Sequence, residues 1–259
     1  MNAPTTAAGR TVTVRVKRQD TPAATAYFET FEVPYKPNLN MTSVLQAIAA
    51  RPVTVEGRAT TPIVYDAACL EEVCGSCTMV INGRVRQACS ALVDTILARE
   101  PGTITIEPMS KFPVLRDLAV DRTRMFENLK RIKAWIPVDG YYHMGPGPRM
   151  DPKTQDQTYA LSRCMTCGCC LEACPQFTKD NTFVGAQIAS MVRYFNTHPV
   201  GRVDADERLE AVMGEGGVTD CGNNQNCVEV CPKEIPLADS WGYIGRAATG
   251  YAIRKMFSK

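Results

Sequence analysis

The segment 69–89 reads "CLEEVCGSCTMVINGRVRQAC" and concentrates four of the chain's cysteines. Its spacing is Cys-x4-Cys-x2-Cys-x11-Cys, from Cys69 to Cys89. Between the last two cysteines, two β-rich runs flank Asn82-Gly83, a dipeptide typical of a two-residue hairpin. The segment therefore predicts a cysteine-rich loop that is closed by a β-hairpin.

This spacing is the one with which plant-type ferredoxins hold a [2Fe–2S] cluster. Gly75 and Ser76 favour that interpretation, because small residues let backbone N–H groups approach the cluster sulfurs. Zinc is the alternative, but structural zinc sites favour two separated Cys-x2-4-Cys pairs. We therefore expect a [2Fe–2S] site with the ligands Cys69, Cys74, Cys77 and Cys89.

The residues around this loop predict a small mixed sheet with one helix. Alternation in 11–17 and 27–33 indicates two strands, and 103–108 indicates another. A short helix through 43–50 would be capped by Asn40 or Thr42.

The second half of the chain is predicted to be mostly helical. Apolar residues recur at helical spacing in 120–136, and 183–198 and 241–257 are also helix-like. The proline- and glycine-rich stretch 137–156 is typical of a loop or linker. A boundary between about residues 111 and 121 gives two domains, 1–115 and 116–259.

Length and composition fit two globular domains. The chain has 259 residues and a formal net charge of +2, which favours no nucleic-acid partner. It contains no apolar run of the roughly 18 to 20 residues that a membrane span needs, and its start lacks a signal-peptide pattern. We expect a cytoplasmic chain, in which 12 clustered cysteines indicate metal rather than disulfides.

Two further cysteine runs align without a gap: "CMTCGCCLEACP" at 164–175 and "CGNNQNCVEVCP" at 221–232. In two-cluster bacterial ferredoxins, each such run gives three ligands to one cluster and its last cysteine to the other. This rule predicts a [4Fe–4S] site with the ligands Cys164, Cys167, Cys170 and Cys231.

The partner site would receive Cys174, Cys221 and Cys227, but Asn224 stands where the fourth cysteine is expected. A neutral amide is a poor ligand for iron, so we expect the fourth iron to be lost and a [3Fe–4S] cluster to remain. A [4Fe–4S] cluster with one water-ligated iron and a degenerate site are the alternatives. Cys169 is left over, and we expect a buried thiol lining the pocket, ahead of redox sensing or ligand exchange.

No catalytic residues are predicted. The two histidines, His143 and His198, lie in different segments and are interpreted as surface or packing residues. The glycines of "MGPGPRM", at 144–150, are interleaved with prolines and do not fit a nucleotide-binding turn. The sequence thus indicates an electron carrier without a catalytic or nucleotide-binding pattern of its own.

Three clusters in this order, in a sheet domain followed by a helical domain, resemble the iron–sulfur subunit of succinate dehydrogenase and fumarate reductase. The segments "CLEEVCGSCTMVINGRVRQAC", "SRCMTCGCCLEACPQF" and "CPKEIP" are most similar to the menaquinone-linked enzymes of the Bacillus type. The resemblance implies an α+β chain: a β-grasp plant-type ferredoxin domain, then an α-helical two-cluster ferredoxin domain.

The resemblance also implies partners. A flavoprotein subunit would oxidise succinate at covalently bound FAD, and electrons would pass through the three clusters to quinone in a cytochrome b anchor with haem b. The [2Fe–2S] cluster would face the flavoprotein, and the [3Fe–4S] cluster would lie nearest the membrane, with Pro175 close to the quinone. The chain would sit on the cytoplasmic face of the bacterial membrane.

The neighbourhoods "QFTKD" and "CGNN" lack the tryptophan and histidine that some relatives place near ubiquinone. This difference argues against a ubiquinone site built by this subunit and suits a quinone pocket formed mainly by the anchor, and the similarity to the Bacillus-type enzymes implies menaquinone as the quinone. The C-terminal "YAIRKMFSK" fits contact with an anchor or with lipid headgroups, and fits equally a solvated helix end.

Two alternatives remain open. Quinol:fumarate reductase runs the reverse reaction on a similar scaffold, and cysteine spacing does not distinguish the direction. A free multi-cluster ferredoxin or an iron–sulfur sensor, without a dedicated enzyme partner, is the more distant alternative.

Overall fold

The computed structural model describes residues 9–137 and 149–258. The chain divides into two compact units, Met1–Asp121 and Arg122–Lys259. A boundary after residue 115 would cut the short strand β6 (Val114–Arg116), which pairs with β7 (Ala119–Val120) inside the first unit.

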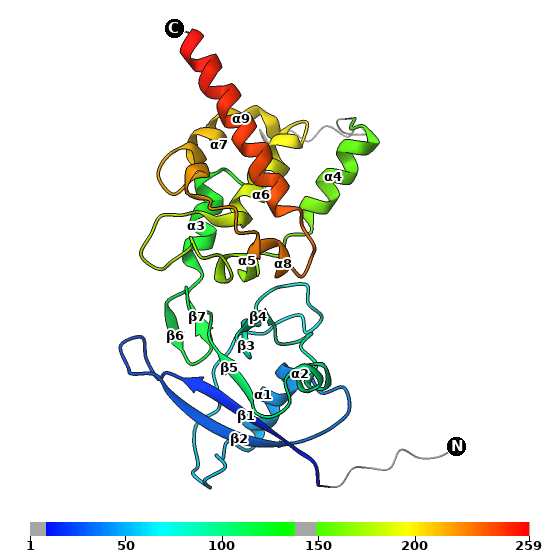
Figure 1. The fold of residues 1–259 in the computed structure, drawn as a ribbon, viewed down its shortest axis with the longest axis vertical. Helices are drawn as coiled ribbons and strands as arrows, with labels where there is room; N and C mark the ends of the chain where they lie inside the picture. Colours follow the sequence, from blue (N-terminus) through cyan, green and yellow to red (C-terminus); the bar gives the residue numbers. More distant parts are fainter. Residues whose placement is uncertain (1–8, 138–148, 259) are drawn as a thin grey trace, which may run out of the picture. The chain divides into compact units, whose positions relative to one another are not determined.

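The first unit is built on a five-stranded sheet in the order β2-β1-β5-β3-β4 (Figure 1). β1 and β5 are parallel, and the other neighbouring strands are antiparallel. The strands are β1 (Thr11–Arg18), β2 (Tyr27–Pro34), β3 (Thr78–Ile81), β4 (Arg84–Gln87) and β5 (Ile104–Glu107). Two helices accompany them, α1 (Met41–Ala50) and α2 (Val93–Arg99). The predicted mixed sheet is confirmed, whereas α2 was not expected.

Local sequence explains these elements. Val12, Val14 and Val16 alternate along β1 and are all buried in the core. Asn40 caps α1, since its side chain accepts a hydrogen bond from the backbone N–H of Ser43 at 2.8 Å. Asn82 and Gly83 both have positive φ, 47° and 72°, as a type I′ hairpin turn requires.

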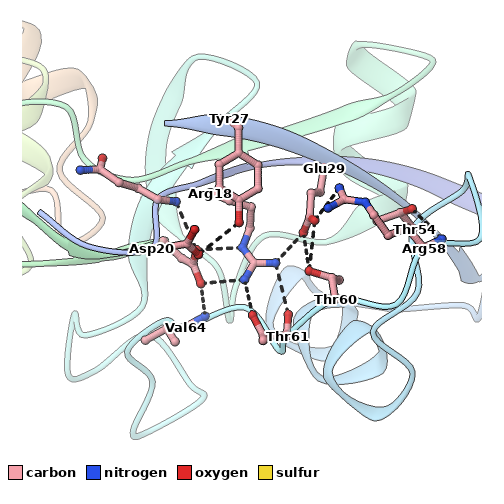
Figure 2. Close-up of polar contacts among 11 residues, drawn as sticks. Arg18, Asp20, Tyr27, Glu29, Thr54, Arg58, Thr60, Thr61 and Val64 are labelled. Carbon is pink, nitrogen blue, oxygen red and sulfur yellow. Dashed lines mark hydrogen bonds and ion pairs between the residues drawn. The ribbon is translucent and has the colours of Figure 1, made fainter. Parts of the chain in front are cut away.

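A buried ion network lies at the end of β1 (Figure 2). The Arg18 side chain donates to Glu29 at 2.7 Å and to Asp117 at 2.8 and 3.1 Å, and none of the three side chains is exposed to solvent. Arg18 also donates to the carbonyl and hydroxyl oxygens of Thr61, and Asp117 accepts from the backbone N–H of Val64. The network thereby ties β1, β2 and the β6–β7 turn to the segment that leads into the cysteine loop.

The second unit is helical in its described residues (Figure 1). α6 packs against α4 and α9, and the stacked rings of Phe183 and Trp241 lie 5.8 Å apart. The α-helices are α3 (Thr123–Arg131), α4 (Pro152–Ser162), α5 (Cys169–Glu172), α6 (Gly185–Thr197), α7 (Ala205–Met213), α8 (Asn226–Glu229) and α9 (Leu237–Phe257). Two 3-10 turns, η1 (Gly201–Asp204) and η2 (Val218–Asp220), complete it.

The structure corrects one part of the predicted loop 137–156. Residues 152–156 belong to α4, because Asp151 accepts a capping bond from the Thr154 N–H at 3.0 Å and Pro152 occupies the first turn. The part of the prediction at 138–148, with His143, lies outside the described residues. Within 9–137 and 149–258, no helix is both long and apolar enough to cross a membrane.

Candidate functional site

The β3–β4 hairpin brings the ends of the first cysteine segment together. Cys77 immediately precedes β3 and Cys89 follows β4, and the Ala88 N–H donates to the Cys77 carbonyl at 3.0 Å. Both thiols are buried, at 3% and 6% exposure, whereas Cys69 and Cys74 lie half-buried in the preceding loop. The hairpin predicted from Asn82-Gly83 therefore closes the loop as expected.

Backbone N–H groups of this loop point at cysteine sulfurs. Cys69 Sγ accepts from Val73 at 3.2 Å and from Cys74 at 3.3 Å, and Cys89 Sγ accepts from Glu72 at 3.3 Å. Leu70, Glu72 and Gly75 have positive φ, which turns successive N–H groups inward. Such donors stabilise negative charge on sulfur, as an iron-bound thiolate cluster requires.

The thiols of this loop differ in acidity. Hydrogen bonds from the Ser76 side chain and from the backbone of Cys69 and Ser76 lower the pKa of Cys74 to about 6. Burial, together with the Cys77 side chain, raises the pKa of Cys89 to about 11. Cys74 therefore gives up its proton more readily than Cys89, whose thiol is kept protonated by burial.

The two later cysteine runs fold alike. Their third residues, Thr166 and Asn223, both have φ of 53°, and their fifth, Gly168 and Gln225, have φ of 87° and 61°. A short helix follows in each run, α5 and α8, and these two helices contact each other. Each non-glycine residue in the left-handed backbone region costs about 1 kcal/mol of conformational free energy, and such strain is concentrated at functional sites.

The first set of thiols in this unit surrounds one pocket. It is lined by Cys164, Cys167, Cys169, Cys170 and Cys231, with Gln187 of α6. Cys231 thus joins three cysteines that precede it by more than 60 residues, in the arrangement that the two-cluster spacing predicts. The Ile235 N–H donates to Cys231 Sγ at 3.4 Å.

The second set lines a neighbouring pocket. Cys174, Cys221 and Cys227 lie there with Pro175, Gln176 and Asn224. Asn224 Nδ2 donates to Gln176 Oε1 at 2.8 Å, which engages the amide that replaces the fourth cysteine. Gly222 lies close to the same amide, since an added Cβ would lie 2.7 Å from Gln176 Nε2 and the Gln176 side chain would have to shift. Gln176 was not predicted as a site residue, although it follows Pro175 and begins the segment "QFTKD", which were the two signals in the sequence.

Burial lowers the acidity of four thiols in this unit. It raises the pKa of Cys164 and Cys227 to about 11 each, and it also raises the pKa of Cys170 and Cys221. Cys167 is the exception, because a hydrogen bond from the Cys169 side chain, aided by the charge of Arg122, lowers its pKa to about 7. Apolar burial disfavours bare thiolates but suits a cluster that shares its charge over several sulfurs.

The thiol sets fit iron–sulfur chemistry. All 12 cysteines lie in the described residues, and none forms a disulfide. Among the described residues, no group of three or more His, Cys, Asp or Glu side chains is arranged to hold a single metal ion. Thiolates around a cluster bind different irons, so their sulfurs need not meet at one point.

Two other predicted residues can be placed. Cys169 is 1% exposed and lines the first pocket. His198 ends α6, and its Nδ1 accepts hydrogen bonds from the N–H groups of Val200 and Gly201 at 3.2 Å each. Its ring therefore organises the turn after α6.

Comparison with known proteins assigns both units. Residues 13–127 match the family model of a 2Fe-2S iron-sulfur cluster binding domain, and residues 160–235 match that of a 4Fe-4S dicluster domain. The chain is 53% identical, over 96% of its length and 96% of the relative's, to the succinate dehydrogenase iron-sulfur subunit of Bacillus subtilis. It is 30% identical to the fumarate reductase iron-sulfur subunit of Wolinella succinogenes, over 92% of this chain and 97% of that one.

A solved structure agrees with these relatives. It is described as "Mycobacterium smegmatis Sdh1 complex in the apo form", and one of its chains superposes with a TM-score of 0.74 at 25% identity. The match covers 93% of this chain and 96% of that chain. The order of a ferredoxin-like sheet unit and a helical dicluster unit is therefore confirmed.

Proposed function

The chain belongs to the family of succinate dehydrogenase and fumarate reductase iron–sulfur subunits, and we propose that it carries electrons from a flavoprotein to a membrane quinone. It would be the electron-transfer subunit of the enzyme and would itself bind neither FAD nor the carboxylate substrate. The observation that carries the proposal is the exchange of cysteines between the two runs, which makes two neighbouring pockets from segments far apart in sequence.

These pockets and the cysteine loop support three ligand sets. Bound clusters would supply one-electron redox chemistry, and the chain supplies the thiolates, the N–H donors and the exclusion of water. We propose three sets: Cys69, Cys74, Cys77 and Cys89 for [2Fe–2S]; Cys164, Cys167, Cys170 and Cys231 for [4Fe–4S]; and Cys174, Cys221 and Cys227 for [3Fe–4S].

The hydrogen bond between Asn224 and Gln176 supports the three-iron assignment. Both groups are neutral amides, and neither provides the thiolate that a fourth iron would need. The Asn224 amide nitrogen instead donates its hydrogen bond to Gln176. The pocket also includes Pro175, which we propose lies near the quinone.

Exposed apolar residues support a flavoprotein partner. Leu70 and Val73 are 51% and 56% exposed on the cysteine loop. Apolar side chains at such positions are suited to contact with another protein surface. Electron entry through the [2Fe–2S] loop would place the cluster at that contact.

The other partners are a cytochrome b anchor with haem b, and menaquinone, at the cytoplasmic face of a bacterial membrane. The 53% identity to the Bacillus subtilis subunit favours succinate oxidation. The fumarate reductase relatives support the reverse direction as the alternative.

The test is purification of the complex in mild detergent, followed by electron paramagnetic resonance (EPR). We expect a flavoprotein and a haem-bearing anchor to copurify, and the air-oxidised sample to give a [3Fe–4S] signal. A stable monomer without these subunits would favour a free ferredoxin or sensor. Faster fumarate reduction than succinate oxidation would favour the alternative direction, and a second [4Fe–4S] signal in place of [3Fe–4S] would refute the assignment at Asn224.

A further inference from the structure

The Gln187 side chain is a buried amide whose role the cysteine ligands do not explain. It is 2% exposed and lies in α6, in the lining of the pocket formed by Cys164, Cys167, Cys170 and Cys231. Among the residues that the structure describes, neither Nε2 nor Oε1 of Gln187 has a hydrogen-bond partner. Leaving a buried amide unpaired is costly, so this position calls for a partner that arrives with the cluster.

The surrounding residues make a purely packing role a poor explanation. Ala186, Ile188 and Ala189 are buried on both sides of Gln187 in the same helix. An apolar side chain would fill such a position without the loss of hydrogen bonds to water.

The first turn of α6 is fixed directly against the cysteine-bearing helix α5. An added Cβ at Gly185 would lie 2.1 Å from Leu171 Cδ2, so the absence of a side chain at Gly185 permits this approach. Gln187 follows two residues later, and its backbone is held by the packing of α6 on α4 and α9. The amide is therefore positioned by rigid elements rather than by a loop.

The chemistry of the pocket selects the donor end of the amide. Its nitrogen carries two N–H donors, whereas iron-bound thiolates and sulfides offer only acceptors. We propose that Gln187 donates an N–H to a sulfur of the [4Fe–4S] cluster or its thiolates and thereby raises the reduction potential of that cluster. This inference rests on the proposed function. Reduction adds one electron and no proton, so a fixed donor stabilises the more negative, reduced form preferentially.

The test is an EPR-monitored redox titration of the purified complex with Gln187→Met, which keeps the length of the side chain and removes both donors. We expect the equilibrium constant for reduction of the [4Fe–4S] cluster to fall about tenfold, a shift of about 59 mV for one electron. The midpoints of the other two clusters serve as internal references and should not move.

Ser190→Ala is the matched control. Ser190 is buried in the same helix, its hydroxyl has no hydrogen-bond partner among the described residues, and it does not line the pocket. Its replacement should leave the [4Fe–4S] midpoint unchanged. An equal shift in both variants would overturn the inference, because general loss of polarity in α6 would then explain it.

A second measurement does not depend on the variant. In wild-type complex grown with glutamine labelled with 15N in its side chain, pulsed EPR of the reduced cluster should detect a coupled amide nitrogen. Lack of that coupling overturns the role of Gln187, even where Gln187→Met fails to assemble. If the wild-type complex gives no [4Fe–4S] signal at all, the proposed function itself fails, and the two failures are thus distinguishable.

Discussion

Replacing Arg18 with methionine should destabilise the first unit strongly. The change leaves two carboxylates, Glu29 and Asp117, with no solvent exposure and without their shared cation. Removing one partner of a buried ion pair costs about 3–5 kcal/mol. Both carboxylates keep other donors, since Glu29 still accepts from Arg58 at 2.8 Å and Asp117 from the Val64 N–H at 3.0 Å. We therefore expect the lower end, about 3 kcal/mol.

This loss should be visible at the cysteine loop. For a domain of roughly 100 residues, 3 kcal/mol corresponds to a fall of about 12 to 24 °C in the unfolding midpoint. The assay is thermal unfolding of the cluster-loaded chain, followed by the visible circular dichroism of the [2Fe–2S] cluster. The network holds the segment that leads into the cysteine loop, so the cluster should be released when the network comes apart.

Arg58→Met is the control, because Arg58 binds the same Glu29 but its side chain is 63% exposed. The cationic end of this pair is solvated, and the buried Glu29 carboxylate keeps its bond from Arg18, so the midpoint should fall by less than in Arg18→Met. If Arg18→Met costs no more than Arg58→Met, the reasoning from burial is wrong.

Three further predictions concern the second unit. Asn224→Cys should supply the missing thiolate and convert the [3Fe–4S] cluster to [4Fe–4S], seen as loss of the oxidised EPR signal; persistence of that signal would contradict the ligand assignment. Gly185→Ala should lower the free energy of unfolding by about 2–4 kcal/mol, because φ is 78° at this position and the added Cβ would lie 2.1 Å from a leucine carbon of α5. Gly214→Ala is the control, since its Cβ would meet no atom within 4 Å, and it should change the midpoint of urea unfolding little. A hydrogen bond from Lys255 lowers the pKa of the exposed Glu210 carboxyl, so the tie between α7 and α9 should be complete above the ordinary glutamate pKa of about 4.3 and should be lost as the pH falls further; the protection factors of the amides at the end of α9, which are corrected for the intrinsic pH dependence of exchange, should then fall in wild type but not in Glu210→Gln, where they are already low.

Local signals made much of the fold predictable. The valine alternation of β1, the Asn40 cap and the Asn82-Gly83 turn each act within a few residues, and each appears in the structure as predicted. The pairing of Cys231 with the earlier run was also accessible, because the two-cluster spacing encodes it.

Contacts between distant segments were not predictable in this way. Arg18 continues the inward-facing alternation of β1, which marks it as buried, but nothing local identifies Asp117, 99 residues away, as its partner. Gln187 similarly lies in a stretch that reads as an ordinary helix, and only the tertiary structure places its amide at a cysteine pocket. The contacts of such residues depend on how helices and strands pack together, and the hydrophobic periodicity of the sequence does not predict that packing.

The interleaved cysteine runs have a consequence for synthesis on the ribosome. All four thiols of the first loop are present once residue 89 has emerged, and the unit that holds them is complete once β5 and the β6–β7 pair have followed, so it can mature while translation continues. The helical unit has no complete set of four thiols until Cys231 has been made, because that residue completes the pocket begun at Cys164. A chain truncated between the two runs would therefore lack Cys221, Cys227 and Cys231, and neither pocket of the helical unit would have its full set of thiols.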